Sequence, residues 1–186
     1  MIMLKKIYFV RHCSAYGQHI DSPLTETGIT QAKQLSQFFK QQNISIDKII
    51  SSPYLRAIET IKPYAEEHNI SISIDQRLKE RILSEEPLDD WLDVLEHSFQ
   101  DPDYKLPGGE SASEVSTRAN QVVTSVLEDD SITNTIIVSH GNLLAIVFKM
   151  FDSNYGFEQW KELRNPDVFL LKHEKNNVSL NRIWDG

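Results

Sequence analysis

Two stretches of sequence, IYFVRH (residues 7–12) and TIIVSHG (residues 135–141), decide the fold of this chain. Each begins with four residues that are mostly β-branched or aromatic, which is typical of a strand buried on both faces of a sheet. Each then turns polar and contains a histidine. We therefore predict two central strands, over 7–10 and 135–138, that end in polar groups.

Segments with helical periodicity lie between and around these strands. The residues 24–28 offer the Thr and acidic side chains of a helix start, and apolar residues recur at helical spacing to about Gln42. By the same reasoning we expect further helices over 54–68, 113–127 and 143–151, and further strands over 47–51, 71–78, 169–172 and 178–182. Alternating strands and helices predict an α/β fold of three layers, with a mainly parallel sheet flanked by helices.

The length of 186 residues fits a single domain spanning 1–186. Residues 82–106 depart from the alternating pattern and carry a Leu/Trp stripe at helical spacing. We interpret them as a small helical insertion, whose apolar stripe packs in the core or serves as a lid over a ligand. As a lid, it would favour a partly apolar ligand.

Composition narrows the classes of function. The chain has 19 Lys and Arg against 27 Asp and Glu, a net charge of −8, and this acidity argues against nucleic-acid or membrane partners. The single cysteine, Cys13, excludes an internal disulfide and cysteine-rich zinc sites. The apolar run near the N-terminus is too short for a signal peptide, so we expect a cytoplasmic protein. The oligomeric state stays open.

Three polar groups are placed where an α/β sheet builds its binding site. Ligands sit at the carboxyl ends of parallel strands, which is where His12 and His140 follow the two central strands. Either histidine alone could simply leave the core and reach water. Arg56, in SSPYLRAIET (51–60), falls in the first turn of a helix, where anions bind and a guanidinium adds donors that fit phosphate oxygens. The alternative for Arg56 is an exposed position with a pair to Glu59 or another acid.

A fourth motif, LPGGES (residues 106–111), contains a Gly-Gly turn before a helix. Ser111 or Ser113 could cap that helix. We therefore expect a structural role for this motif.

Taken in order, the Arg-His after the first strand, SSPxxRAxET, GGES and the late SHG resemble the histidine phosphatase superfamily. This two-histidine family includes cofactor-dependent phosphoglycerate mutases and many small phosphatases. The matches run from about residue 7 to 145, most of the chain. The resemblance implies an enzyme that acts on a small phosphorylated substrate.

The resemblance also assigns roles. His12 would be the nucleophile, Arg11 and Arg56 would hold the phosphoryl oxygens, and His140 would donate a hydrogen bond to the same group. The family's general acid is a Glu soon after the strand that follows the SSPxxR helix, and Glu80 matches best. Glu85 and Glu86 are the alternatives for this role.

The chemistry of these side chains is consistent with those roles. Phosphoryl transfer needs positioning and charge stabilisation, which two arginines and a second histidine can supply without a metal. Neighbouring Arg11 and Arg56 disfavour protonation of His12, so that its ring can attack and form a phosphohistidine. Glu80 would protonate the leaving group and later deprotonate water. We see no P-loop and no carboxylate cluster with metal-ligand spacing, and expect no cofactor and no metal.

The chain departs from the family pattern at two positions. Cys13 replaces the usual Gly, which restricts φ to negative values or imposes strain. A cysteine mechanism would need Arg six positions after Cys13, where His19 stands. Many relatives carry Asn six residues after the nucleophile, and Gln18 is expected to bind substrate in its place.

Gly141 and Asn142 are also expected to bind substrate. Asn142 would orient His140 or the phosphate, or else cap the following helix. The stretch from His12 to Leu24 is shorter than in the mutases, which favours hydrolysis in an open pocket. We therefore predict a phosphomonoesterase. The alternatives are a phosphoglycerate mutase-type phosphoryl transfer and a relative that binds a phosphorylated ligand without turnover.

Overall fold

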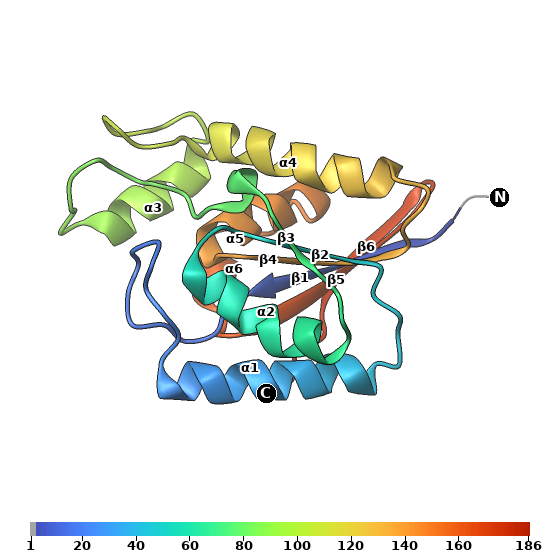
Figure 1. Cartoon of the computed structure of the whole chain (residues 1–186). Coiled ribbons are helices and arrows are strands. Elements are labelled where there is room, and N and C mark those ends of the chain that lie inside the picture. Colours follow the sequence, from blue (N-terminus) through green and yellow to red (C-terminus); the bar gives the residue numbers. More distant parts are fainter. Residues whose placement is uncertain (1–2) are drawn as a thin grey trace.

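The computed structural model describes residues 3–186 and contains a six-stranded sheet of order β3-β2-β4-β1-β5-β6 (Figure 1). The strands are β1 (Lys5–Arg11), β2 (Lys48–Ser51), β3 (Ile72–Ile74), β4 (Asn134–Ser139), β5 (Asp167–Glu174) and β6 (Asn177–Arg182). Strands β3, β2, β4 and β1 pair in parallel, whereas β5 pairs antiparallel with both of its neighbours. The predicted strands at 7–10 and 135–138 therefore lie side by side in the middle of the sheet.

Helices cover both faces of this sheet. They are α1 (Glu26–Gln41), α2 (Leu55–Glu67), α3 (Trp91–Gln100), α4 (Ala112–Glu128), α5 (Gly141–Phe151) and α6 (Phe157–Lys161), with a 3-10 turn, η1 (Gln76–Leu78). Helices α1 and α2 lie on one face, and α4 and α5 on the other (Figure 1). The predicted α/β architecture of three layers is confirmed.

The alternation of side chains along β1 shows why its residues 7–10 are all apolar. Ile7 and Phe9 point into the cluster formed with α4 and α5, whereas Tyr8 and Val10 point into the cluster formed with α1 and α2. All four side chains are buried. A stretch of strand with a helical layer on each face has no solvent side, so polar residues are found only at its two ends.

Side chains at the helix starts fix where two of the helices begin. Thr25 caps α1, because its hydroxyl accepts the Gly28 N–H at 3.0 Å. Of the two serines considered for the next cap, Ser111 is the one used. Its hydroxyl accepts the Glu114 N–H, and the Glu114 carboxylate accepts the Ser111 N–H, which makes a capping box.

Three local predictions need correction. The strand expected over 71–78 ends at Ile74, because the Asp75 carboxylate accepts the Arg77 N–H and starts η1. Helix α5 begins at Gly141, two residues before the predicted start. Helix α6 was not predicted, since its five residues are too few to show a period.

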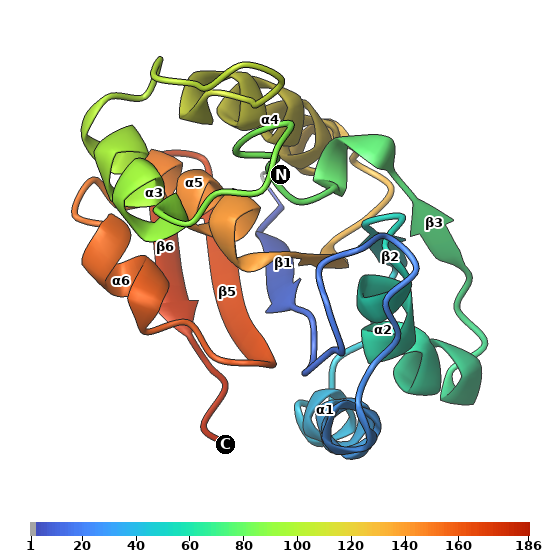
Figure 2. The same cartoon turned by 90° about the vertical axis from the view of Figure 1, so that its left-hand side faces the viewer.

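The segment 82–106 contains α3, which packs beside α6 at the end of the sheet where β1 and β4 finish (Figure 2). This is the predicted helical patch of the insertion. Within residues 3–186, none of the helices has both the length and the apolar character to span a bilayer.

Candidate active site

The two histidines meet at the carboxyl end of the central strands. Strand β1 pairs with β4 through Arg11 and Ser139, and one step further the His12 N–H donates to the Ser139 carbonyl at 3.1 Å. The rings of His12 and His140 then lie 5.2 Å apart between centroids, inclined at 60°. Segments separated by more than a hundred residues thus bring both imidazoles to one place.

Hydrogen bonds fix which nitrogen of His12 carries the proton. Nδ1 lies 2.7 Å from the Cys13 carbonyl, which can only accept, so Nδ1 carries the hydrogen. Arg56 donates its Nε–H to His12 Nε2 at 3.2 Å, so Nε2 presents a lone pair. Burial lowers the pKa of His12 to about 3, aided by the charges of Arg56 and Arg11 and opposed by the bond to Cys13. His12 is therefore a neutral imidazole whose Nε2 can act as a nucleophile.

Arg56 is buried behind His12 without a carboxylate partner. Its side chain is 1% exposed, and its Nη1 donates to the carbonyls of Gln18 and His19 at 3.1 and 3.0 Å. Its guanidinium also lies 4.7 Å from the centre of the Tyr54 ring. Within residues 3–186 it forms no ion pair, and the alternative pairing with Glu59 is wrong, because Glu59 accepts from the Leu24 N–H. The charge of Arg56 is therefore directed at the site.

Arg11 brings a second guanidinium with an unused donor. Its Nη1 donates to the Leu163 carbonyl at 2.9 Å, while its buried Nε has no hydrogen-bond partner in the described chain. The guanidinium passes so close to Gly141 that a Cβ there would lie 3.0 Å from its Cζ and Nε. The absence of a side chain at Gly141 therefore leaves the space that the Arg11 guanidinium occupies. A buried N–H without a partner is costly, and an anion in the site would satisfy it.

His140 is fully buried beside His12 and lines neither of the two cavities described below. Its Nε2 lies 2.7 Å from the Ser52 hydroxyl, and its buried Nδ1 has no partner among the described residues. Burial, and then the nearby His12 and Arg56, hold the pKa of His140 well below its usual value. If Ser52 donates to Nε2, the neutral ring carries its hydrogen on Nδ1 and can donate it to a ligand. Ser52 was not predicted as a site residue, although it stands in the SSP motif after β2.

Glu80 lies at the start of α5, beside the histidines. Its carboxylate accepts the N–H groups of Asn142 at 3.1 Å, Leu143 at 2.9 Å and Arg81 at 2.8 Å. Burial lowers the pKa of the neighbouring Arg11, and the Glu80 carboxylate partly opposes this shift. The carboxylate is thus tied to the same helix that follows His140.

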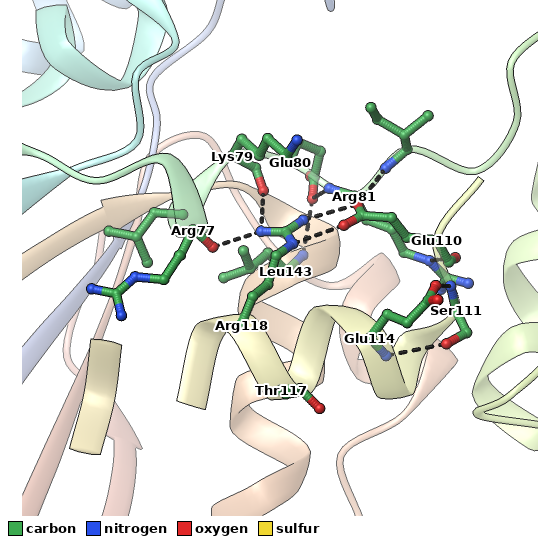
Figure 3. A network of polar contacts seen from close by, with 12 residues as sticks. Arg77, Lys79, Glu80, Arg81, Glu110, Ser111, Glu114, Thr117, Arg118 and Leu143 are labelled. Carbon is green, nitrogen blue, oxygen red and sulfur yellow. Dashed lines mark hydrogen bonds and ion pairs between the residues drawn. The ribbon is translucent and has the colours of Figure 1, made fainter. Parts of the chain in front are cut away.

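The segment that carries Glu80 is clamped from the other side by Arg118 of α4 (Figure 3). Arg118 donates from Nη1 to the carbonyls of Arg77 and Lys79 at 2.6 and 2.9 Å. Its Nε and Nη2 reach the two oxygens of Glu110 at 2.9 and 3.0 Å. Glu110 belongs to the GGES motif, for which we expected a structural role. Through Arg118, this motif also helps to hold the segment that carries Glu80.

Two cavities meet at these residues. The larger, about 660 Å³ and called the main cavity below, is lined by Arg11, Gln18, Tyr54, Arg56, Glu80, Arg81, Ile82, Leu83, Ser84, Glu86, Pro87, Leu88, Trp91, Leu95, Gly141, Asn142 and Trp160. The smaller, about 230 Å³, shares Arg11, Gln18, Glu80 and Gly141 with it and reaches His12. Of the three candidate acids, Glu80 lines both cavities, Glu86 only the main cavity, and Glu85 neither.

The remaining predicted residues take up different positions. Gln18 is exposed, and its side-chain oxygen lies 3.4 Å from Arg56 Nη2. Asn142 does not cap α5: the N-cap is His140, and the Asn142 Oδ1 is buried without a partner in the described chain. Asn165, which was not predicted, donates to the His12 carbonyl at 2.8 Å. An isolated Asn far along the chain gave no sequence signal.

Cys13 is part of the core. It is fully buried, and its N–H donates to the Thr60 hydroxyl at 2.8 Å. Burial raises the pKa of the thiol to about 12, so it stays protonated at neutral pH. Cys13 does not adopt a positive φ, which removes the expected strain from loss of the family's Gly.

Comparisons with known proteins show which family the chain belongs to. Residues 7–185 match the profile of the histidine phosphatase superfamily (branch 1). The probable phosphoglycerate mutase GpmB of Salmonella choleraesuis (strain SC-B67) is 31% identical over 193 residues, which cover 92% of this chain and 86% of that protein.

Two solved structures share the fold. A mycobacterial glucosyl-3-phosphoglycerate phosphatase superposes with a TM-score of 0.73 at 20% identity, covering 97% of each chain. A phosphoglycerate mutase from Bacillus anthracis strain Sterne superposes with a TM-score of 0.76 at 19% identity, covering 98% of this chain and 93% of that one. With its phosphoryl-handling relatives and the profile match along nearly its whole length, the chain belongs to the histidine phosphatase superfamily.

Proposed function

We propose that the chain hydrolyses phosphomonoesters through a phosphohistidine on His12, without a metal. The observation that carries the proposal is the state of the His12 ring, whose Nδ1–H is bound to a carbonyl while its Nε2 lone pair faces Arg56. Around it stand two guanidiniums, neither of them in an ion pair within residues 3–186. This arrangement supports binding of a tetrahedral dianion beside a nucleophile.

In the first half of the reaction, His12 Nε2 attacks phosphorus and the bond to the ester oxygen breaks. Arg11, Arg56 and His140 stabilise the charge on the three other oxygens, and each such donor is worth roughly 3 kcal/mol of barrier. Glu80 supplies a proton to the departing oxygen, so that an alcohol leaves. The product is a phosphohistidine and a deprotonated Glu80.

In the second half, a water molecule attacks the phosphohistidine and the phosphorus–nitrogen bond breaks. Glu80 takes the proton of the attacking water, which restores its starting state. Inorganic phosphate leaves, and His12 regains its lone pair. Splitting the displacement in this way replaces one difficult step by two easier ones.

The test measures p-nitrophenyl phosphate turnover in His12→Asn and looks for a phosphorylated enzyme in Glu80→Gln. We expect His12→Asn to abolish turnover, and Glu80→Gln to accumulate an acid-labile phosphate on His12, because p-nitrophenolate leaves without a proton but water still needs a base. A matched control is His173→Asn, since His173 pairs with Lys5 at the opposite end of β1.

Turnover that survives in His12→Asn would exclude His12 as the nucleophile. Suppose instead that the wild-type chain binds phosphate but releases product from no ester. The chain would then be a relative that binds a phosphorylated ligand without turnover.

One observation favours a second candidate, a phosphoglycerate mutase: the Salmonella relative carries that name. A mutase would return the phosphoryl group from His12 to a second hydroxyl before water reaches it. It predicts exchange between 3- and 2-phosphoglycerate that depends on 2,3-bisphosphoglycerate. Phosphate release from esters with no such exchange would dispose of the mutase.

A further inference from the structure

The end of the main cavity that is not shared with the smaller, His12-lined cavity is walled by two tryptophans. Trp91 from α3 and Trp160 from α6 meet edge to face, with ring centroids 6.2 Å apart at 85°. Trp91 is 44% exposed although it is a large apolar side chain. The two helices lie side by side (Figure 2), and the aliphatic Leu88 also lines the main cavity. This end therefore offers apolar, flat surface to a ligand.

The charges at this end do not suit a second anionic group. The carboxylate of Glu86 lines it and would repel one. Arg81 also lines it, but this nearly buried guanidinium donates to the Glu110 carbonyl at 3.0 Å and to the Ser98 hydroxyl at 2.8 Å. Its charge is balanced by Glu110 and by Glu80. Arg11 and Arg56 stand at the other end, beside the histidines.

We propose that this tryptophan-walled end is a binding subsite for an aromatic ring in the alcohol part of the phosphomonoester. The proposal rests on the proposed function, since the subsite continues directly from the phosphoryl-binding end. Aromatic rings gain from edge-to-face and offset contacts with indoles, and the cavity volume of about 660 Å³ accommodates both the ring and the phosphoryl group. A phosphoglycerate, which has a carboxylate and no ring, is a poor match.

The test compares 2-naphthylmethyl phosphate, n-propyl phosphate and 3-phosphoglycerate, because all three release alkyl alcohols and differ mainly in what fills the subsite. We expect kcat/KM for the naphthylmethyl ester to be about tenfold or more above the others, mostly through a lower KM. In Trp91→Ala and Trp160→Ala, KM for the naphthylmethyl ester should rise about tenfold, a larger change than for the propyl ester.

The matched control is Leu92→Ala. Leu92 follows Trp91 on α3 and is equally exposed, at 44%, but does not line the main cavity. Its substitution should leave KM unchanged. Equal kcat/KM for the naphthylmethyl and propyl esters, or a preference for 3-phosphoglycerate, would overturn the subsite while leaving the phosphatase intact.

A second measurement does not need turnover. Binding of 2-naphthylmethylphosphonate, which cannot be hydrolysed at its carbon–phosphorus bond, can be followed by tryptophan fluorescence. We expect tighter binding than for propylphosphonate, and loss of that difference in Trp91→Ala. If no ester is hydrolysed but this difference holds, the proposed function fails and the subsite stands; if the two phosphonates bind equally, the subsite fails.

Discussion

Burial decides the charge of the two histidines, and with it the chemistry of single residues. A free histidine is half protonated near pH 6.5, whereas burial lowers the pKa of His12 to about 3 and that of His140 well below its usual value. His12 is therefore neutral, as a nucleophile must be, at any pH well above 3. Burial of these rings lowers the stability of the fold in acid, because the rings bind protons in the unfolded chain but resist protonation in the folded chain.

This difference predicts that stability falls on mild acidification. The unfolded chain binds protons on His12 below about pH 6.5, and the folded chain does not until about pH 3. The free energy of unfolding therefore keeps its full value above pH 6.5. Below pH 6.5 it declines by about 1.4 kcal/mol per pH unit for each such histidine. Urea unfolding at pH 7.5 and 5.5 should show a smaller decline in His12→Asn than in wild type, and an unaltered decline in His173→Asn. An equal decline in all three would contradict the buried neutral state.

Cys13 should be unreactive in the folded protein. It is fully buried, and burial raises its pKa to about 12, so almost no thiolate exists at pH 8. A thiol reagent such as iodoacetamide should label it only after denaturation, and Cys13→Ser should keep p-nitrophenyl phosphate turnover. Rapid labelling of native protein with loss of activity would show that the thiol reaches the site.

Among the secondary-structure elements, α4 and α5 cooperate to place one carboxylate. The N-terminal N–H groups of α5 bind the Glu80 oxygens, and Arg118 from α4 holds the carbonyls of residues 77 and 79 next to it. Within residues 3–186, backbone N–H groups hold this carboxylate in position without an ion pair to a cationic side chain. Errors of about 1 Å in such a position can cost roughly a hundredfold in rate.

Arg118→Ala should therefore impair proton delivery more than it impairs binding. We expect kcat for n-propyl phosphate, whose alkoxide needs a proton, to fall roughly 10- to 100-fold, and kcat for p-nitrophenyl phosphate to fall much less. Arg118→Lys should recover part of the loss. The measurement is kcat for both esters in each variant.

The control is Arg77→Ala, because the Arg77 side chain pairs with Asp75 and its carbonyl remains available to Arg118. Equal losses for both esters in Arg118→Ala would mean that Arg118 only supports the fold.

The whole molecule carries a net charge of −8, yet its sheet gathers cations at one edge. Because side chains supply the positive charge in the proposed mechanism, EDTA should leave turnover of p-nitrophenyl phosphate unchanged, while vanadate and phosphate should inhibit competitively. Loss of activity in EDTA that Mg²⁺ restores would contradict this. The assay is a steady-state titration with each compound.

Short-range sequence patterns predicted the layers and the central strands well. The stretches at 7–10 and 135–138 are apolar because helices cover both sides, and that cause can be read without coordinates. The same logic placed His12 and His140 at one edge. What it could not show was the state of the His12 ring, which depends on an Arg56 bond across 44 positions of sequence.

The parts that escaped prediction depend on single long-range contacts. Ser52, Asn165 and the Arg118–Glu110 pair each act through one or two hydrogen bonds that leave no periodic signal. Helix α6 is too short to show amphipathicity, although it supplies Trp160 to the main cavity. The roles of Glu80, Gln18 and Asn142 in turnover, and the use of 82–106 as a lid, stay predictions.

The bond from the His12 N–H to the Ser139 carbonyl has a consequence for how this protein loses activity. It continues the ladder between the two innermost strands, so the backbone segments that carry the two imidazoles separate only when that ladder opens. In proteins, such central amides exchange their hydrogens with deuterium almost entirely through global opening. We therefore expect heat inactivation and cooperative unfolding to follow the same transition.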